Sequence, residues 1–318
     1  MNAVRQLPLF STYPVNVTDL HSKSRLRDAV PLFQSYLFHE GKSENTVKAF
    51  TGDLQLLAEW GGDDVRLGSY TTSKLNEFMH WLEYGRGVPC SRKSYARRVT
   101  TLKVFFKWLH NLAAIPVDPA NAILQRSGPA PLAEILSPDE INDALEYAVS
   151  LRRIRLNAPK PDARPELLFR LLVDTGIKKG ETALLALDSV IIEDDHPYLI
   201  VRHKSPRDIY KERLIALDPA WLPVYDAYLA QYRPTSLIFN CTPRNLEYIL
   251  EDVGRGAGIE NKVSFERMRW TCAVRDYRRG DDPEAIREKL GLSKISWQET
   301  FSKIKRLTEL QIEHEQEG

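Results

Sequence analysis

The 318-residue sequence has little cysteine: Cys90, Cys241 and Cys272 are widely spaced and odd in number. A disulfide framework or a zinc knuckle needs paired or closely spaced cysteines, so we expect three reduced packing residues. No apolar run approaches the roughly 18 residues that span a bilayer, and the N-terminus lacks the basic-then-apolar order of a signal peptide. These absences predict a cytoplasmic protein without a membrane segment.

Short catalytic motifs are missing too. The sequence contains no glycine-rich phosphate loop, no Cys/His metal cluster and no GxSxG nucleophile elbow. We therefore expect no metal and no cofactor. Internal repeats and low-complexity segments are also absent. The hydrophobic content of 43% and the charged content of 27% are ordinary for a globular protein. The length is sufficient for two domains with separate cores.

Charge is balanced overall but unevenly distributed. The formal net charge is only +1, which by itself argues against a dedicated DNA-binding protein. However, the segment 86–111, RGVPCSRKSYARRVTTLKVFFKWLHN, contains seven lysines and arginines and no acidic residue, whereas acids gather in IEDDH (192–196) and the final EHEQEG. Such a charge run is often only a solvated helix face. The lack of any acid, with Ser91, Ser94 and Tyr95 interleaved, favours phosphate contact.

The first third of the chain predicts helices. In SENTVKAFTGDLQLLAEWGG the apolar residues recur every three or four positions, Ser43 occupies an N-cap position and Gly61–Gly62 stop the helix. The segments RLRDAVPLFQSYLFHEG and TTSKLNEFMHWLEYG and the basic segment show the same spacing. We expect an N-terminal arm over 1–24 and a compact four-helix domain over 25–115.

A proline-rich stretch, IPVDPANAILQRSGPAPLAEILSPDE, predicts a linker over 116–136, after which Ser137 caps a new helix. The remainder, 137–318, is mixed. PELLFRLLVDTGIKKGETALLAL indicates helix, turn and helix, whereas PYLIVRHKSPRDIYKERLIAL has β-rich ends around a charged hairpin. The sequence therefore predicts a mainly α, two-domain protein whose second domain is α+β with a small antiparallel sheet.

These segments resemble the tyrosine recombinase family, also called phage integrases. GKSENTVKAFTGDLQLLAEW and CSRKSYARRVTTLKVFFKWLHNLAAIPVDPANAI resemble its SAM-like core-binding domain. DTGIKKGETALLAL, HKSPRDIYKERLIAL, FERMRWTCAV and EKLGLSKISWQETFSKI resemble its catalytic domain, and the likeness runs from about Arg25 to Leu307. The resemblance implies double-stranded DNA as partner and strand cleavage by a tyrosine that attacks a phosphate, aided by cations and a general acid.

The resemblance also implies a set of catalytic positions, from which this sequence departs. Lys178 stands where TGLRxSE has arginine, and an ammonium cannot make the two-pronged phosphate contact of a guanidinium. Lys204 matches the hairpin lysine of GKGNKER, with Lys211 as the alternative. In the segment ERMR, which matches HxxR, Arg269 is retained but Glu266 replaces histidine. A carboxylate there would oppose a bound phosphate.

The last two positions differ as well. Leu292 replaces the histidine of LGHSS, and nine residues further Phe301 stands where the tyrosine nucleophile is expected; no tyrosine follows it. Losing a nucleophile removes the chemical step, whereas losing one charge-stabilising donor costs about 3 kcal/mol. Tyr277, downstream of Arg269, is an alternative nucleophile, and Tyr210 in the hairpin is better suited to touching DNA. The sequence predicts DNA binding without cleavage.

Three classes of function follow from these residues. The first is a catalytically silent DNA-binding protein, alone, as a homo-oligomer or beside a partner recombinase. The second is an active recombinase with a displaced or partner-supplied nucleophile, and the third is a protein-interaction scaffold without DNA binding. Ordinary surface charge is the alternative role for Lys204 and Arg269, but their places in ordered motifs favour a site. The predicted DNA contacts are Ser43, Arg92, Lys93, Ser94, Arg97, Arg98, Lys103, Lys178, Lys204, Arg267 and Arg269.

Overall fold

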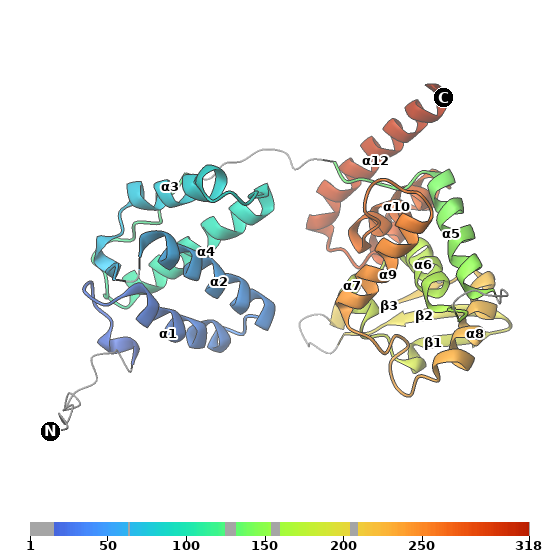
Figure 1. The fold of residues 1–318 in the computed structure, drawn as a ribbon, viewed down its shortest axis with the longest axis horizontal. Coiled ribbons are helices and arrows are strands. Elements are labelled where there is room, and N and C mark those ends of the chain that lie inside the picture. The colour runs from blue at the N-terminus through green and yellow to red at the C-terminus, as the bar shows by residue number, and fades with distance from the viewer. Residues whose placement is uncertain (1–15, 63, 125–131, 154–159, 204–208, 318) are drawn as a thin grey trace. The chain divides into compact units, whose positions relative to one another are not determined.

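The chain forms two compact units, Met1–Ala130 and Pro131–Gly318, each with its own hydrophobic core (Figure 1). The computed structural model describes residues 16–62, 64–124, 132–153, 160–203 and 209–317. The protein is mainly helical and has one small sheet in the second unit, which confirms the predicted fold class. Across the described residues, no helix is long and apolar enough to cross a bilayer.

The first unit is built from α1 (Leu26–His39), α2 (Glu44–Gly61), α3 (Thr72–His80) and α4 (Arg92–Asn111). The boundaries of α2 follow the sequence signals: the Ser43 hydroxyl accepts a hydrogen bond from the N–H of Thr46 at 3.3 Å, and Gly62 ends the helix with a φ of 90°. The predicted four-helix, SAM-like arrangement is confirmed.

Aromatic side chains dominate the first core. Phe33 of α1 packs against Phe105 and Trp108 of α4, with ring centroids 5.1 and 5.2 Å apart, and rings of this size bury much apolar surface. Leu20, within the predicted arm, and Ile123, within the predicted linker, are buried in the same core. The compact unit thus reaches beyond residues 25–115 on both sides.

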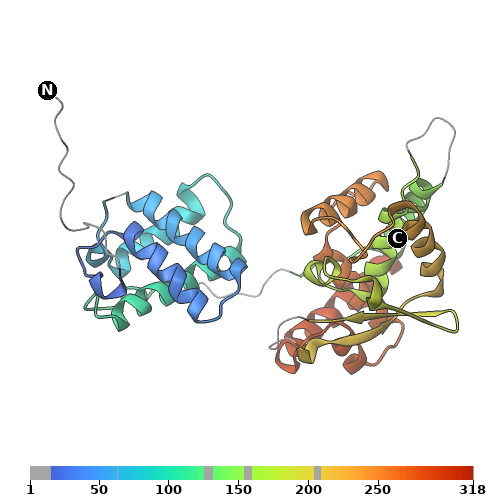
Figure 2. The same ribbon diagram turned by 90° about the horizontal axis from the view of Figure 1, so that it is seen from below.

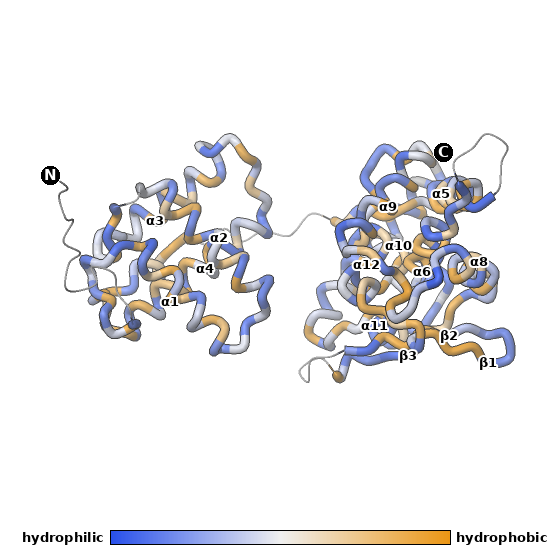
Figure 3. Tube along the Cα trace, turned by 60° about the horizontal axis from the view of Figure 1, so that its bottom comes forward, coloured by the Kyte–Doolittle hydropathy of each residue, from blue (hydrophilic) through white to orange (hydrophobic). Residues whose placement is uncertain are grey.

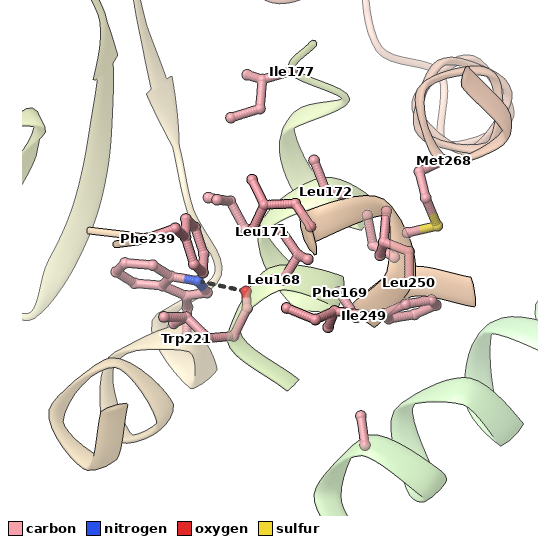
Figure 4. Packing of buried hydrophobic residues seen from close by; sticks show 14 of the residues in the cluster. Leu168, Phe169, Leu171, Leu172, Ile177, Trp221, Phe239, Ile249, Leu250 and Met268 are labelled. Atoms are coloured by element: carbon pink, nitrogen blue, oxygen red, sulfur yellow. Dashed lines mark hydrogen bonds between the residues drawn. The ribbon is translucent and has the colours of Figure 1, made fainter. Parts of the chain in front are cut away.

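The second unit is organised around α6 (Arg164–Thr175), most of which is buried (Figure 4). The indole N–H of Trp221 donates to the Leu167 carbonyl at 3.4 Å and fixes the ring beneath this helix. The helices around α6 are α5 (Pro138–Arg152), α7 (Lys179–Thr182), α8 (Leu222–Tyr232), α9 (Pro243–Gly256), α10 (Phe265–Arg278), α11 (Pro283–Lys289) and α12 (Lys294–Glu317).

Three antiparallel strands lie at the edge of the second unit (Figure 2): β1 (Val190–Glu193), β2 (His196–Val201) and β3 (Arg213–Ala216), in the order β1-β2-β3. Leu199 pairs with Val190 and Ile215, and this row faces the core. β2 and β3 are mainly hydrophobic, whereas the β1–β2 turn is hydrophilic (Figure 3). The hairpin of β2 and β3 was predicted; β1 was not.

The C-terminal stretch consists of a helix, a break and a second helix. α11 ends at Lys289, Gly291 turns the chain with a φ of 59°, and α12 begins at Lys294. Trp297 and Ile304 of α12 are buried against α10 and α11 in a third apolar cluster. This cluster holds the last two positions of the predicted catalytic set.

Candidate nucleic-acid interface

One side of α4 is basic and accessible. One exposed or half-buried side of the helix carries basic residues at intervals of four or six positions, and we call them the basic stripe: Lys93, Arg97, Lys103 and Lys107. Arg92 and Lys93 occupy the first turn, which has no acidic residue. Cations there face the positive end of the helix dipole, an arrangement that costs about 0.3–1 kcal/mol per charge unless an anion binds.

A buried carboxylate joins α2 to the basic stripe. Asp53 accepts hydrogen bonds from the Arg97 guanidinium at 2.8 Å and from the Thr101 hydroxyl at 2.9 Å. Burial raises the pKa of Asp53, while the Thr101 hydrogen bond and the charges of Arg97 and Arg98 act in the opposite direction. The side chain of Arg97 nevertheless stays 40% exposed, so the bond to Asp53 orients a cation that still reaches solvent.

Three of the predicted DNA contacts form hydrogen bonds within the first unit: Arg98, Ser43 and Ser94. Only 9% of Arg98 is exposed, and its guanidinium donates to the Cys90 sulfur at 2.8 Å. It therefore does not belong to the basic stripe, contrary to the predicted DNA contact, because its charge is turned into the domain. Ser43 and Ser91 cap α2 and α4 by accepting the N–H groups of Thr46 and Ser94.

In the second unit, the segment TGIKKGE connects α6 to α7. Gly176 ends α6 in the left-handed region with a φ of 55°, and Lys178 is the N-cap of α7, its N–H donating to Glu181 at 2.8 Å. Lys178 is exposed. Partial desolvation and the neighbouring Arg269 lower the pKa of Lys178, with Glu181 opposing them and Lys211 adding to the decrease. Like charges are thus held close together at this place.

Arg269 lies on α10 and braces two chain segments. Its guanidinium donates to the Gly176 carbonyl at 2.7 Å and to the Leu290 carbonyl, which follows α11. Burial lowers the pKa of Arg269 to about 10, Arg213 adds to the decrease and Glu181 opposes it. Arg269 is half-buried, so it is both a strut and part of the cationic surface.

Arg213 of β3 is the residue that the sequence reasoning missed. It binds Glu181 with two hydrogen bonds of 3.2 and 2.9 Å and donates to the Lys289 carbonyl at 2.7 Å. Burial alone would raise the pKa of Glu181, but the bonds from Arg213 lower it. The available signal was the KER triplet that follows the hairpin. We define Lys178, Lys211, Arg213 and Arg269 as the cationic cluster.

Two lysines are candidates for the hairpin position, Lys204 and Lys211. Lys204 lies outside the described residues. Lys211, the alternative, is half-buried at the end of a 3-10 turn, and its ammonium lies 5.4 Å from the ring centroid of Tyr210. Tyr210 is 70% exposed. An accessible aromatic ring and a cation therefore lie side by side next to β3.

Glu266 and Arg267 start α10 and have opposite environments. Glu266 is exposed in the first turn, where a negative charge suits the helix dipole. Arg267 is 7% exposed and donates to the carbonyls of Asn261 and Ile135 and to the Glu140 carboxylate at 3.1 Å. Arg267, which was predicted to contact DNA, therefore ties α10 to α5 and lies outside the cationic cluster, because its donors point into the protein.

Leu292 and Phe301 both lie in apolar surroundings. Leu292 is half-buried and lines an open groove of about 750 Å³ between β3 and α11. Phe301 stacks on Trp297 with centroids 5.1 Å apart and meets the ring of Tyr277 edge-on at 5.5 Å. The Lys305 ammonium lies 4.5 Å from its ring centroid. At the position where the sequence analysis predicts the tyrosine, the structure thus has an aromatic packing residue without a hydroxyl.

Comparisons of the sequence with known proteins agree with this architecture. The phage integrase N-terminal SAM-like domain matches residues 30–111. Tyrosine recombinase XerD of Listeria innocua is 23% identical over 297 residues, covering 89% of this chain and 96% of the relative. Tyrosine recombinase XerD of Vibrio cholerae is 25% identical over 298 residues, covering 87% of this chain and 92% of the relative.

Solved structures share the fold. A lambda integrase dimer bound to a COC′ core site matches with a TM-score of 0.67 and 16% identity, covering 87% of this chain and 77% of that one. XerH site-specific recombinase in a post-cleavage complex with palindromic difH substrate also matches with a TM-score of 0.67, at 17% identity, covering 90% of this chain and 83% of that one. The sequence relatives, the N-terminal domain and the fold together support a place for this chain in the tyrosine recombinase, or phage integrase, family.

Proposed function

We propose that this protein binds double-stranded DNA, in the cytoplasm, and does not cleave it by the tyrosine mechanism of its family. The observation that carries the proposal is the packing of Phe301 between Trp297 and Tyr277. A phenyl ring has no lone pair to attack phosphorus, so no phosphotyrosine can form at this position. Leu292 and Glu266 add to the loss, because the family pattern has histidine at both positions and neither side chain offers an imidazole N–H to the phosphate or the leaving oxygen.

DNA binding is supported by two surfaces, one on each unit. The basic stripe of α4 offers accessible cations, and Lys93 in the first turn gains stability when an anion binds beside it. The cationic cluster supplies a second concentration of positive charge around Lys178 and Arg269. Contacts of this kind bind phosphates rather than bases, so the affinity should fall steeply with salt.

The alternative is a recombinase that uses another nucleophile. Tyr277 is half-buried and its ring is engaged by Phe301, which disfavours it. Tyr210 is exposed beside Lys211, and this placement keeps it in consideration. A homo-oligomer, or a partner recombinase on the same DNA, could also provide a tyrosine. The third class, a scaffold without DNA binding, would leave the basic stripe without a function.

The test uses the full chain and DNA selected from random duplexes and from genomic fragments. Binding is measured by fluorescence anisotropy across a salt series, and the complexes formed on nicked suicide duplexes are then separated on a denaturing gel. We expect salt-sensitive binding and no covalent band. A covalent band lost on Tyr210→Phe would establish the alternative, and the absence of binding to every duplex would leave the scaffold class.

A further inference from the structure

Two glycines in helices have no reason within the folded chain to be glycine. For most of the glycines whose surroundings the structure describes, either φ is positive or an added Cβ would meet a neighbour, as at Gly256, where it would lie 2.0 Å from Tyr147. Gly52 and Gly180 differ. Neither has a positive φ, and a Cβ at either position would meet no atom within 4 Å.

Gly52 stands in the middle of α2, as the ninth of 18 residues. Glycine in a helix interior is less favourable than alanine, because it loses more backbone entropy on folding and buries nothing. An alanine would fit at position 52 without contact and would favour the helix. Gly52 therefore lowers the stability of α2, and no described contact within the first unit requires a glycine at this position.

Both glycines precede a buried acid that orients an arginine. Asp53, 2% exposed, follows Gly52 and binds Arg97 of the basic stripe. Glu181, 8% exposed, follows Gly180 and binds Arg213 of the cationic cluster. In each case the space where a Cβ would stand is open, while the acid that follows the glycine is withdrawn from solvent and paired with an arginine.

We infer that the main chain at Gly52 and at Gly180 forms two contact points for the sugar–phosphate backbone of DNA, one in each unit. The inference rests on the proposed function. A missing Cβ lets a ligand approach the protein backbone closely. The accessible cations that would hold a phosphate are Arg97 of the basic stripe in the first unit and Lys178 of the cationic cluster in the second. The buried carboxylate adds no repulsion at the surface, because it faces its arginine. If DNA were held by accessible cations alone, a residue with a side chain could stand at positions 52 and 180. The two glycines therefore point to contact with the main chain as well.

The test compares Gly52→Ala, Gly52→Gln and Gly180→Ala with the parent and with Ser35→Gln, which places a glutamine at an exposed position of α1. Melting temperature and the Kd for a bound duplex are measured for each variant. We expect a melting temperature equal to or above that of the parent for Gly52→Ala. We expect a several-fold weaker Kd for both alanine variants, a larger loss for Gly52→Gln, and an unchanged Kd for Ser35→Gln.

The salt series separates a steric effect from a lost charge. No charge is removed, so the slope of log Kd against log salt should equal that of the parent in every variant. If the parent binds duplex DNA and the three glycine variants, melting as the parent does, keep its Kd, the inference is overturned and the proposed function stands. If the parent binds no duplex, both are overturned.

Discussion

At the scale of single residues, similar side chains on this chain do different work. Arg267 and Arg269 are two positions apart on α10, yet Arg267 is buried against Glu140 and Arg269 remains part of the cationic surface. The sequence motif could identify both as basic but could not separate them. Glu140 lies 127 residues away in the chain, and a local sequence pattern cannot predict a partner at that distance.

The burial of Arg267 predicts a stability phenotype. Arg267→Ala would leave Glu140 and the carbonyls of Asn261 and Ile135 without their donor, and breaking a buried ion pair costs about 3–5 kcal/mol. Because Glu140 is partly exposed, the lower end is expected. Urea unfolding followed by far-UV circular dichroism would measure the loss. A variant as stable as the parent would mean that the pair contributes nothing.

The exposure of Lys178 predicts a binding phenotype instead. Lys178→Gln removes one cation from the cationic cluster and leaves the N–H that caps α7 in place. The slope of log Kd against log salt should decrease by about 1, with little change in melting temperature. Glu266→Gln is the matched opposite change and should strengthen binding, since it removes an exposed negative charge. Equal slopes for Lys178→Gln and the parent would mean that Lys178 does not contact a DNA phosphate.

A substitution at position 301 tests directly whether a tyrosine there could cleave DNA. Phe301→Tyr restores a hydroxyl, but Leu292 and Glu266 still lack the donors that the family pattern places there. We expect no covalent product on a suicide duplex, with a melting temperature within a few degrees of the parent. The appearance of a covalent band would show that the remaining cations suffice and that the nucleophile alone had been lost.

At the scale of elements, the local signals predicted more than the long-range ones. The caps at Ser43 and Ser137 and the helix stop at Gly61–Gly62 were predicted, because turn and cap chemistry depends on neighbouring residues. β1 was not predicted, since four residues before an acidic turn give too short a pattern. The pair of Glu181 and Arg213 was also missed, because it depends on how β3 packs against α7.

Acidic substitutions in the first turn of α4 should raise the stability of the protein and weaken its binding to DNA. Arg92→Glu with Lys93→Glu places acids at the positive end of the helix dipole, a change worth about 0.3–1 kcal/mol per position. The double variant should melt at a higher temperature and bind DNA at least tenfold more weakly, the latter a rough expectation for two lost and reversed phosphate contacts. Lys107→Glu, in the last turns of α4, should not raise the melting temperature.

The ion pair between Glu181 and Arg213 makes the second unit sensitive to acid. The pKa of Glu181 is lowered below its ordinary value of 4.5, so its contribution is fully present above that pH and is lost as the pH falls through the lower, folded value. Glu181→Gln should cost about 3 kcal/mol at pH 7. The difference in melting temperature between parent and variant should narrow below about pH 4.5. A constant difference would mean that Glu181 is not the titrating group.

At the scale of the whole molecule, two separate cores predict two separable folding units. The first core, with Phe33, Phe105 and Trp108, contains no residue from beyond Ile123 among those described. Fragment 1–130 should therefore melt cooperatively by itself and bind duplex DNA more weakly than the full chain, since it lacks the cationic cluster. A fragment that shows no thermal transition would mean that the first unit needs the second in order to fold.

The double role of Arg269 has a consequence for recognising activity in related sequences. Its hydrogen bonds to the Gly176 and Leu290 carbonyls hold α6 to the α11–α12 break. Arg269 therefore stabilises the fold whether or not the protein cleaves DNA. Its presence in a distant homologue therefore has little diagnostic value for cleavage. Exposed Glu266 has no comparable bond within the described residues, and its position is the more informative marker of whether a relative still performs chemistry.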